Sequence, residues 1–192
     1  MAAKERSPIL TTEKPAWAER SSSLASVSIF LSDERGRLLM VQDLDEHGGK
    51  WSPIAGYVDD LMGEEPEIAA LREAKEELGL DIRLDQLLGV WHYYEKNGIH
   101  EAPSGNGNGD KNGKVKMHVG YAFCGTILDG TFKMQAEEIQ NYGFFTPAEI
   151  EQMHIDRKLK TPEYNYDGFK LWEKGTKHPL DIVRSNTRAR VI

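Results

Sequence analysis

The stretch GYVDDLMGEEPEIAALREAKEELGL, residues 56–80 of this 192-residue chain, decides the fold. It predicts a helix that begins at Pro66 and ends before Gly79, because proline suits the first helical turn and glycine the position just past the last one. Acidic residues at positions 64, 65 and 67 add favourable negative charge near the helix N-terminus. Four apolar residues recur at helical spacing and predict the stripe that faces the core: Ile68, Leu71, Ala74 and Leu78.

Another face of this helix gathers three carboxylates, since Glu73, Glu76 and Glu77 stand at positions i, i+3 and i+4. We expect Arg72 to neutralise only one of these charges. Lys75 is poorly placed to neutralise another, because it projects roughly 100–200° around the helix from the three glutamates. An acidic helix face that merely keeps a protein soluble is the plainer interpretation. Half-buried carboxylates about 5 Å apart, however, would repel by on the order of 3 kcal/mol per pair at an effective dielectric of about 20. A divalent cation such as Mg²⁺ or Mn²⁺ would relieve this repulsion, so the pattern predicts a metal–phosphate site.

The segment REAKEELGL, with Glu64 eight residues before Arg72, resembles the second half of the Nudix box. That signature is a glycine, five residues, a glutamate, seven residues and then R-E-U-x-E-E-x-G-U, where U is aliphatic. Eight residues fall in register: Glu64, Arg72, Glu73, Glu76, Glu77 and Gly79, with Ala74 and Leu80 at the U positions. The loop after Gly56 departs from the signature, because seven residues instead of five separate Gly56 from Glu64. The resemblance covers about residues 24–153.

This resemblance implies an α/β (α+β) fold, namely an α/β/α sandwich built on a mixed β-sheet. It implies a Mg²⁺-dependent (or Mn²⁺-dependent) pyrophosphohydrolase that cleaves a phosphoanhydride bond in a nucleoside di- or triphosphate or a related diphosphate (NDP-X). Metal-activated water would attack phosphorus. Glu73 and Glu77 are the implied principal metal ligands, with Glu76 as a further ligand or base. Arg72 would orient a carboxylate, and Glu64 would complete the metal site from the loop.

Other candidate site residues lie outside the helix. Relatives of this kind often recruit another carboxylate from a loop before the last strand, and Glu137 and Glu138 are the candidates here. Gly56 and Tyr57 precede the box and are expected to contact substrate. In the aromatic run 91–94, side chains such as Trp91 and Tyr93 could stack on a base or sugar, although aromatic residues in a strand more often pack in a core.

The flanking segments predict strands and one more helix. Residues 24–32 and 37–43 are expected to pair as a β-hairpin around a turn at residues 33–36. Further strands are predicted at 51–58, 82–95, 114–130 and 141–145. Thr146 and Pro147 predict the start of a short helix, with the threonine as its N-cap.

The chain divides into a polar arm (1–23), the Nudix-like domain (24–155) and a C-terminal helix or tail (156–192). The tail carries nine Lys and Arg against five acids, a net charge of +4. This charge could steer phosphate or a partner, although a solvated tail is the commoner outcome. The insert at 97–113 is rich in Gly and Asn but lacks the Gly-Lys-Ser/Thr spacing of a phosphate loop.

Composition excludes several classes of protein. With 24 Lys and Arg against 31 Asp and Glu, the net charge of −7 makes nucleic acid an unfavourable partner. No apolar run reaches the ~18 residues of a membrane span, and the N-terminus has no apolar stretch typical of export, so we expect a cytoplasmic protein. Cys124 is the single cysteine, which excludes an internal disulfide.

The expected partner is therefore a small nucleotide or other diphosphate. The segments 51–60 and 156–175 are more similar to the Nudix phosphatases that act on nucleoside tri- and diphosphates and thiamine pyrophosphate than to the ADP-sugar subgroup. Relatives are often dimers, so the sequence leaves open whether this chain forms a homodimer. Two alternatives also stay open: a Nudix-fold nucleotide-binding regulatory module without turnover, and an unrelated acidic domain.

Overall fold

The computed structural model describes residues 23–59, 63–96 and 115–183 of the chain. The arm expected over residues 1–23 lies outside this part except for its last residue, and the segment 97–113 lies wholly outside it. The described elements follow in chain order: β1 (Ser23–Leu31), β2 (Leu38–Asp43), η1 (Asp45–His47), β3 (Trp51–Ser52), β4 (Ile54–Tyr57), α1 (Pro66–Leu78), β5 (Asp81–Lys96), β6 (Val115–Asp129), β7 (Ile139–Phe145), α2 (Pro147–Ile155), α3 (Pro162–Glu173) and η3 (Leu180–Ile182).

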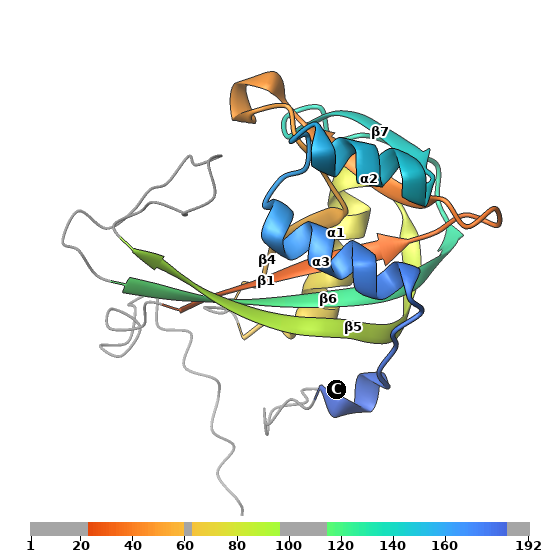
Figure 1. The fold of residues 1–192 in the computed structure, drawn as a ribbon. Coiled ribbons are helices and arrows are strands. Elements are labelled where there is room, and N and C mark those ends of the chain that lie inside the picture. Colours follow the sequence, from red (N-terminus) through yellow and green to blue (C-terminus); the bar gives the residue numbers. More distant parts are fainter. Residues whose placement is uncertain (1–22, 60–62, 97–114, 184–192) are drawn as a thin grey trace, which may run out of the picture.

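The strands form two sheets (Figure 1). The larger sheet has the order β4-β1-β6-β5 and is mixed, because β1 runs parallel to β6 but antiparallel to β4. The long strands β5 and β6 pair antiparallel along nearly their whole length. The smaller sheet has the order β3-β2-β7 and is antiparallel. The expectation of a mixed α+β fold is therefore confirmed.

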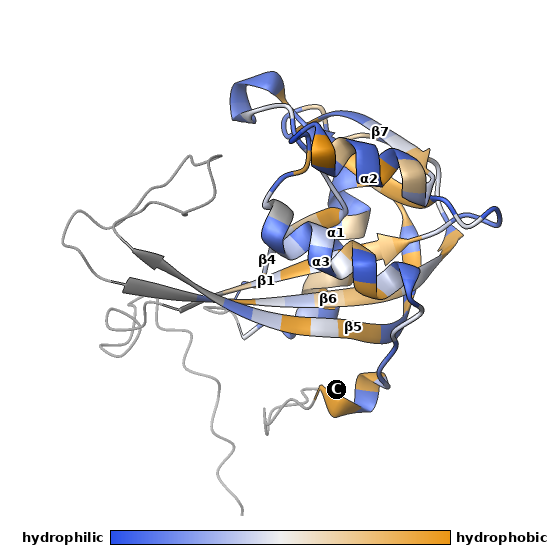
Figure 2. Cartoon of the chain, viewed as in Figure 1, coloured by the Kyte–Doolittle hydropathy of each residue, from blue (hydrophilic) through white to orange (hydrophobic). Residues whose placement is uncertain are grey.

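The predicted hairpin between the first two strands is wrong. A tight turn does form, in which the Gly36 N–H donates to the Asp33 carbonyl at 3.0 Å, and it is hydrophilic (Figure 2). After a single bridge between Ser32 and Leu38, however, the two strands enter different sheets. Both are interior strands with buried side chains on both faces. Their pairing is therefore set by long-range partners on each edge rather than by the turn.

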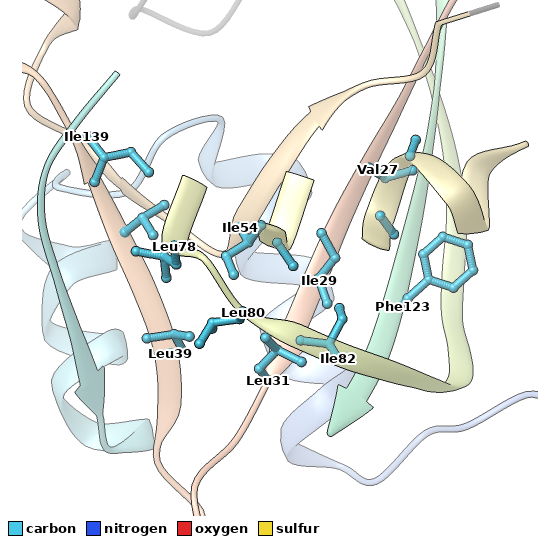
Figure 3. Close-up of a cluster of buried hydrophobic side chains, with 14 of the residues drawn as sticks. Val27, Ile29, Leu31, Leu39, Ile54, Leu78, Leu80, Ile82, Phe123 and Ile139 are labelled. Carbon is cyan, nitrogen blue, oxygen red and sulfur yellow. The ribbon is translucent and has the colours of Figure 1, made fainter. Parts of the chain in front are cut away.

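The side chains of β1 alternate between two hydrophobic cores, one on each face of its sheet. Val27, Ile29 and Leu31 pack in the core beneath α1, together with Leu78 and Ile139 (Figure 3). The intervening Phe30 packs in a second core, which is covered by α2 and α3. Helices thus cover both faces, which is the predicted α/β/α sandwich.

The predicted ends of the helices are confirmed. Pro66 occupies the first turn of α1, and Gly79 follows its last turn in the left-handed conformation with φ of 71°, where glycine carries no steric penalty. At α2, the Thr146 hydroxyl accepts from the Glu149 N–H while the Glu149 carboxylate accepts from the Thr146 N–H. This reciprocal capping box fixes where α2 begins.

The predicted apolar stripe of α1 is only half right. Ala74 and Leu78 are fully buried, but Ile68 and Leu71 are 53% and 38% exposed. The helix is rotated relative to the predicted stripe, so that small and acidic side chains share its buried side: Ala69, Ala70, Glu73, Ala74, Glu77 and Leu78. The alanines let α1 lie close to the sheet, where the two glutamates reach β4.

The C-terminal segment packs on the same body. Leu159 and Phe169 are buried in the second core, and Leu159 forms a parallel bridge with Trp51. A Cβ on Gly168 would lie 2.7 Å from the Phe30 ring, so glycine lets α3 lie directly on β1. None of the helices in the described ranges is long and apolar enough to cross a membrane.

Candidate active site

An open cleft of about 700 Å³ lies where α1, β4, the loop before β7 and the segment before α3 meet. Its acidic part is formed by four residues: Asp59, Glu73, Glu76 and Glu138. Arg72 and Lys160 add two positive charges. The cleft therefore joins residues that are far apart in the sequence, and α1 supplies three of its six charged side chains.

Arg72 organises the carboxylates of the cleft. Its Nη1 donates to Glu73 at 2.7 Å and to Glu76 at 2.8 Å, while Nε and Nη2 donate to the two oxygens of Glu64 at 2.9 and 3.0 Å. Nη2 also donates to the Tyr57 carbonyl at 2.9 Å. A guanidinium offers five N–H groups in a planar fork, so Arg72 contacts three carboxylates, but its single positive charge offsets only one of their charges, as expected. These hydrogen bonds, led by those to Glu64, raise the pKa of Arg72.

Glu64 supports Arg72 from the loop. Besides its two contacts with Arg72, it accepts a hydrogen bond from the Asp59 N–H at 2.8 Å, and its own N–H donates to the Asp59 carbonyl at 3.1 Å. The hydrogen bonds from Arg72 hold the pKa of Glu64 below its ordinary value. Both carboxylate oxygens are therefore engaged within the protein. The contacts with Asp59 and Arg72 keep Glu64 at the site.

Glu73 lies against the backbone of Gly56. A Cβ at Gly56 would be only 2.0 Å from Cδ and Oε1 of Glu73, so the strand must carry glycine there for this carboxylate to fit. Burial raises the pKa of Glu73, Arg72 opposes this rise, and the charges of Glu76 and Glu138 add to it. Sequence reasoning placed Gly56 near substrate, and the structure gives it this second role.

Glu77 is the most buried carboxylate of the group, with 6% of its surface exposed. Its Oε1 accepts from the Ala55 N–H at 3.3 Å, but its Oε2 has no hydrogen-bond partner within the described part of the chain. Burial raises the pKa of Glu77 to about 8, and the charge of Glu73 adds to this effect. A buried oxygen without a partner, beside a second carboxylate, is what a cation would satisfy.

Glu73 and Glu77 thus fit a hard divalent cation by the chemistry of their donors. Across residues 23–59, 63–96 and 115–183, no three His, Cys, Asp or Glu side chains are arranged as a ready metal site. Arg72 explains this arrangement, because it holds the carboxylates of Glu73 and Glu76 toward its own guanidinium. A third carboxylate ligand would have to turn away from Arg72 or come from the loop before β7.

Of the two loop candidates, the structure brings Glu138 to the cleft. Its charge raises the pKa of both Glu73 and Glu77. Glu137 is exposed and does not line the cleft. The next residue, Ile139, is buried in the core and anchors this loop beside α1.

The structure places only some of the candidate substrate-binding residues at the cleft. Gly56 and Tyr57 line the cleft, and Tyr57 is 60% exposed at its edge. Trp91 does not line it but packs edge-on against Tyr164, with ring centroids 5.1 Å apart. The side chain of Tyr93 lies outside the described part of the structure.

Lys160 is one of the cleft residues that sequence reasoning did not identify. Its Nζ lies 2.9 Å from Asp43, and its N–H donates to the Trp51 carbonyl at 2.8 Å. Its charge partly opposes the rise in the pKa of Glu77. The net charge of +4 over residues 156–192 was the only signal in the sequence, and it could not indicate which lysine reaches the site.

Comparison with known proteins identifies the family. Residues 23–164 match the family model of the NUDIX domain. The isopentenyl-diphosphate Delta-isomerase of Streptomyces avermitilis is 32% identical over 149 residues, which cover 75% of this chain and 68% of that protein.

Solved structures share the fold. A NUDIX hydrolase from Nitrosomonas europaea aligns with a TM-score of 0.65 and 19% identity over 87% of this chain and 99% of its own. An ADP-ribose pyrophosphatase from Streptococcus suis aligns with a TM-score of 0.53 and 18% identity over 79% of this chain and 90% of its own.

The family match agrees with the register of the box residues and with the α/β/α sandwich. The expected family, with the fold and the box residues that the resemblance implied, is therefore confirmed. The chain belongs to the NUDIX domain family.

Proposed function

We propose that this protein is a Mg²⁺-dependent (or Mn²⁺-dependent) pyrophosphohydrolase that cleaves a phosphoanhydride bond in an NDP-X substrate. The observation that carries this proposal is the buried Glu77, whose Oε2 lacks a partner among the described residues and lies next to the buried Glu73. Both residues stand at box positions where the family resemblance implies metal ligands. Keeping two such carboxylates charged in a protein interior requires a compensating cation.

Each charged residue of the site has a distinct proposed role. Glu73 and Glu77 would hold the cation, which when bound neutralises phosphate charge and lowers the pKa of a water molecule. Arg72 keeps Glu73 and Glu76 oriented. Glu76, whose side chain is 50% exposed, and Glu138 stand at the cleft as candidate proton acceptors through their carboxylate oxygens. The base could be either of these two carboxylates, because both line the cleft.

The charge of the cleft also supports this function. A diphosphate is a polyanion, and the acidic lining of the cleft would repel it in the absence of cations. Arg72 is already shared among three carboxylates, and Lys160 is paired with Asp43. A bound divalent cation would reverse the local sign of charge and let the substrate approach.

The test is a panel assay with Mg²⁺ that measures phosphate or pyrophosphate release. The panel contains dNTPs, oxidised dNTPs, ADP-ribose, nucleotide sugars, dinucleoside polyphosphates and thiamine pyrophosphate. We expect turnover of at least one compound and a loss of several orders of magnitude in Glu77→Gln. Glu46→Gln is the matched control, because Glu46 is a 76% exposed glutamate on η1, away from the cleft. Equal rates for Glu77→Gln and the wild type would remove Glu77 from the mechanism.

The Streptomyces relative raises a second candidate, isomerisation of isopentenyl diphosphate, on the basis of 32% identity. Cys124, the single cysteine, is buried in the second core and does not line the cleft, and burial raises the pKa of its thiol to about 11. It is therefore poorly suited to exchange protons with a substrate. Including isopentenyl diphosphate in the panel separates the candidates, since hydrolysis releases phosphate and isomerisation does not.

Several finer expectations belong to the same proposal. Preference for nucleoside tri- and diphosphates or thiamine pyrophosphate would appear directly in the panel. A regulatory module without turnover would bind panel compounds but release no phosphate from any of them. A cytoplasmic location, a homodimer and the limits of the domain at residues 24–155 stay predictions.

A further inference from the structure

Arg72 has no hydrogen-bond donor left for a substrate. A guanidinium carries five N–H groups, and Arg72 makes five hydrogen bonds, one from Nε, two from Nη1 and two from Nη2. The acceptors are carboxylate oxygens of Glu64, Glu73 and Glu76 and the carbonyl of Tyr57. A phosphate in the cleft must therefore find its donors on other residues.

Three other side chains that line the cleft carry N–H or O–H groups: Tyr57, Gln135 and Lys160. Lys160 directs its Nζ at Asp43, 3.1 Å from Oδ1 and 2.9 Å from Oδ2. Tyr57 is 60% exposed at the edge of the cleft. The amide of Gln135 is half-buried and makes no side-chain hydrogen bond within the residues that the structure describes. Gln135 thus offers the cleft an amide that the protein itself does not use.

The backbone at Gln135 is fixed to α1. The Gln135 N–H donates to the Glu77 carbonyl at 3.0 Å, and the Lys133 N–H donates to the Leu78 carbonyl at 2.9 Å. These two hydrogen bonds join the loop before β7 to the last turn of the box helix. A side chain on a backbone held in this way is in place before a ligand arrives, which lowers the entropic cost of binding.

A single helical turn sets Gln135 beside Glu138. The Gln135 carbonyl accepts from the Glu138 N–H at 3.1 Å and from the Ile139 N–H at 3.0 Å. Residues three apart on such a turn project to the same side, and both Gln135 and Glu138 line the cleft. The charge of Glu138 acts on Glu73 and Glu77, so this turn faces the proposed metal ligands.

We propose that Gln135 contacts the substrate, and that its Nε2 donates a hydrogen bond to a non-bridging oxygen of the phosphoryl group that water attacks. The proposal rests on the proposed hydrolase function and adds to it a substrate contact from outside the box. A neutral amide suits this position, because it does not pair with the surrounding carboxylates as Arg72 and Lys160 do.

The contact would act during the reaction. As the water oxygen forms its bond to phosphorus, the proton of the water passes to a carboxylate of the cleft, and the bridging P–O bond breaks with its electron pair going to the leaving phosphate. Gln135 neither gives nor takes a proton in this exchange. It holds the phosphoryl group in a fixed position relative to Glu138 while charge shifts across the phosphoryl oxygens. A fixed donor of this kind typically raises kcat by about 100-fold.

The first experiment measures binding by calorimetry, with Mn²⁺ alone and with methylene diphosphonate in the presence of Mg²⁺. The phosphonate resists hydrolysis. Gln135→Met keeps the length of the side chain but removes the amide. We expect this variant to bind methylene diphosphonate more weakly by about ten-fold or more and to bind Mn²⁺ within two-fold of the wild type. Gln152→Met, at an exposed glutamine of α2, is the matched control and should leave both affinities unchanged.

The second experiment measures kcat on the best substrate of the panel, together with a thermal melt. Gln135→Met should lower kcat by about 100-fold without changing the melting temperature. If this variant fails to fold, the isosteric Gln135→Glu replaces the donor with an acceptor and should weaken the phosphonate at least as much.

Three results would overturn the contact: no phosphonate binding to the wild type, phosphonate affinity of Gln135→Met within two-fold of the wild type, or an equal loss of Mn²⁺ and phosphonate affinity in that variant. The two proposals also fail separately. Phosphonate binding that depends on Gln135, without phosphate release from any panel compound, would support the contact and contradict the hydrolase.

Discussion

Replacing Gly56 with alanine is a direct perturbation of the carboxylate cleft. A Cβ at this position would lie 2.0 Å from Glu73 Cδ and 2.5 Å from Glu73 Oε2, whereas real Cβ contacts essentially never fall below 3.0 Å. The carboxylate must therefore move by about 1 Å or more. Gly56 does not have a positive φ, so alanine suits the backbone and the contact with Glu73 is the main conflict.

Gly56→Ala should change the stability of the protein only slightly but lower its activity strongly. Moving Glu73 breaks its 2.7 Å contact with Arg72, whose side chain is 33% exposed, so about 1 kcal/mol of stability is lost. Alanine in place of glycine at a compatible site restores about 0.4–1 kcal/mol by restricting the unfolded chain. The free energy of unfolding should thus change by less than about 1 kcal/mol. A misplacement of 1 Å in a catalytic site, by contrast, lowers kcat/KM on the order of 100-fold.

The assay is phosphate release from the best substrate of the panel, together with a thermal melt of each variant. Gly36→Ala is the control, because Gly36 has a φ of 72° and a Cβ there would meet no atom within 4 Å, so it should lose about 1 kcal/mol of stability but no activity. Gly56→Ala should have no further effect in a Glu73→Ala background. Activity within three-fold of wild type in Gly56→Ala would refute the assigned position of Glu73.

Three more predictions follow from the charges and burial of single residues. Folding raises the pKa of Glu77 from 4.5 to about 8, so the contribution of this carboxyl group to stability is full below pH 4.5 and is lost as the pH rises through 8. The metal-free protein should therefore melt at a lower temperature at pH 8.5 than at pH 6. Glu77→Gln should reduce the difference between these two melting temperatures. Burial raises the pKa of Cys124 to about 11, so iodoacetamide at pH 8 should label it only after unfolding, and rapid labelling of the native protein would contradict its burial. Lys160→Met should raise KM for the diphosphate substrate about ten-fold with little change in melting temperature, and an unchanged KM would exclude a phosphate contact.

The features predicted well from sequence are those that local chemistry determines. Pro66 and Gly79 mark the ends of α1, and Thr146 marks the start of α2, because each satisfies or spares backbone groups within a few residues of itself. The spacing of the box acids likewise places Glu73 and Glu77 on one side of a helix whatever the rest of the fold does.

The features that sequence reasoning missed depend on contacts between distant segments. The partners of β1 and β2 lie elsewhere in the chain, so a good turn at residues 33–36 did not make a hairpin. Ile68 and Leu71 looked like core residues, but α1 is rotated so that Glu73 faces Gly56. Lys160 reaches the cleft only because its segment pairs with Trp51. No local pattern encodes these positions.

The central claim is that Glu73 and Glu77 hold a divalent cation, and a metal titration tests it most directly. Mn²⁺ binding followed by electron paramagnetic resonance, with and without ADP-ribose, should show a bound ion in the wild-type protein and in Glu46→Gln. Binding should weaken by at least ten-fold in Glu77→Gln. Absence of binding to the wild type even with the nucleotide present, or equal binding to Glu77→Gln, would contradict the assignment of this pair as the metal site.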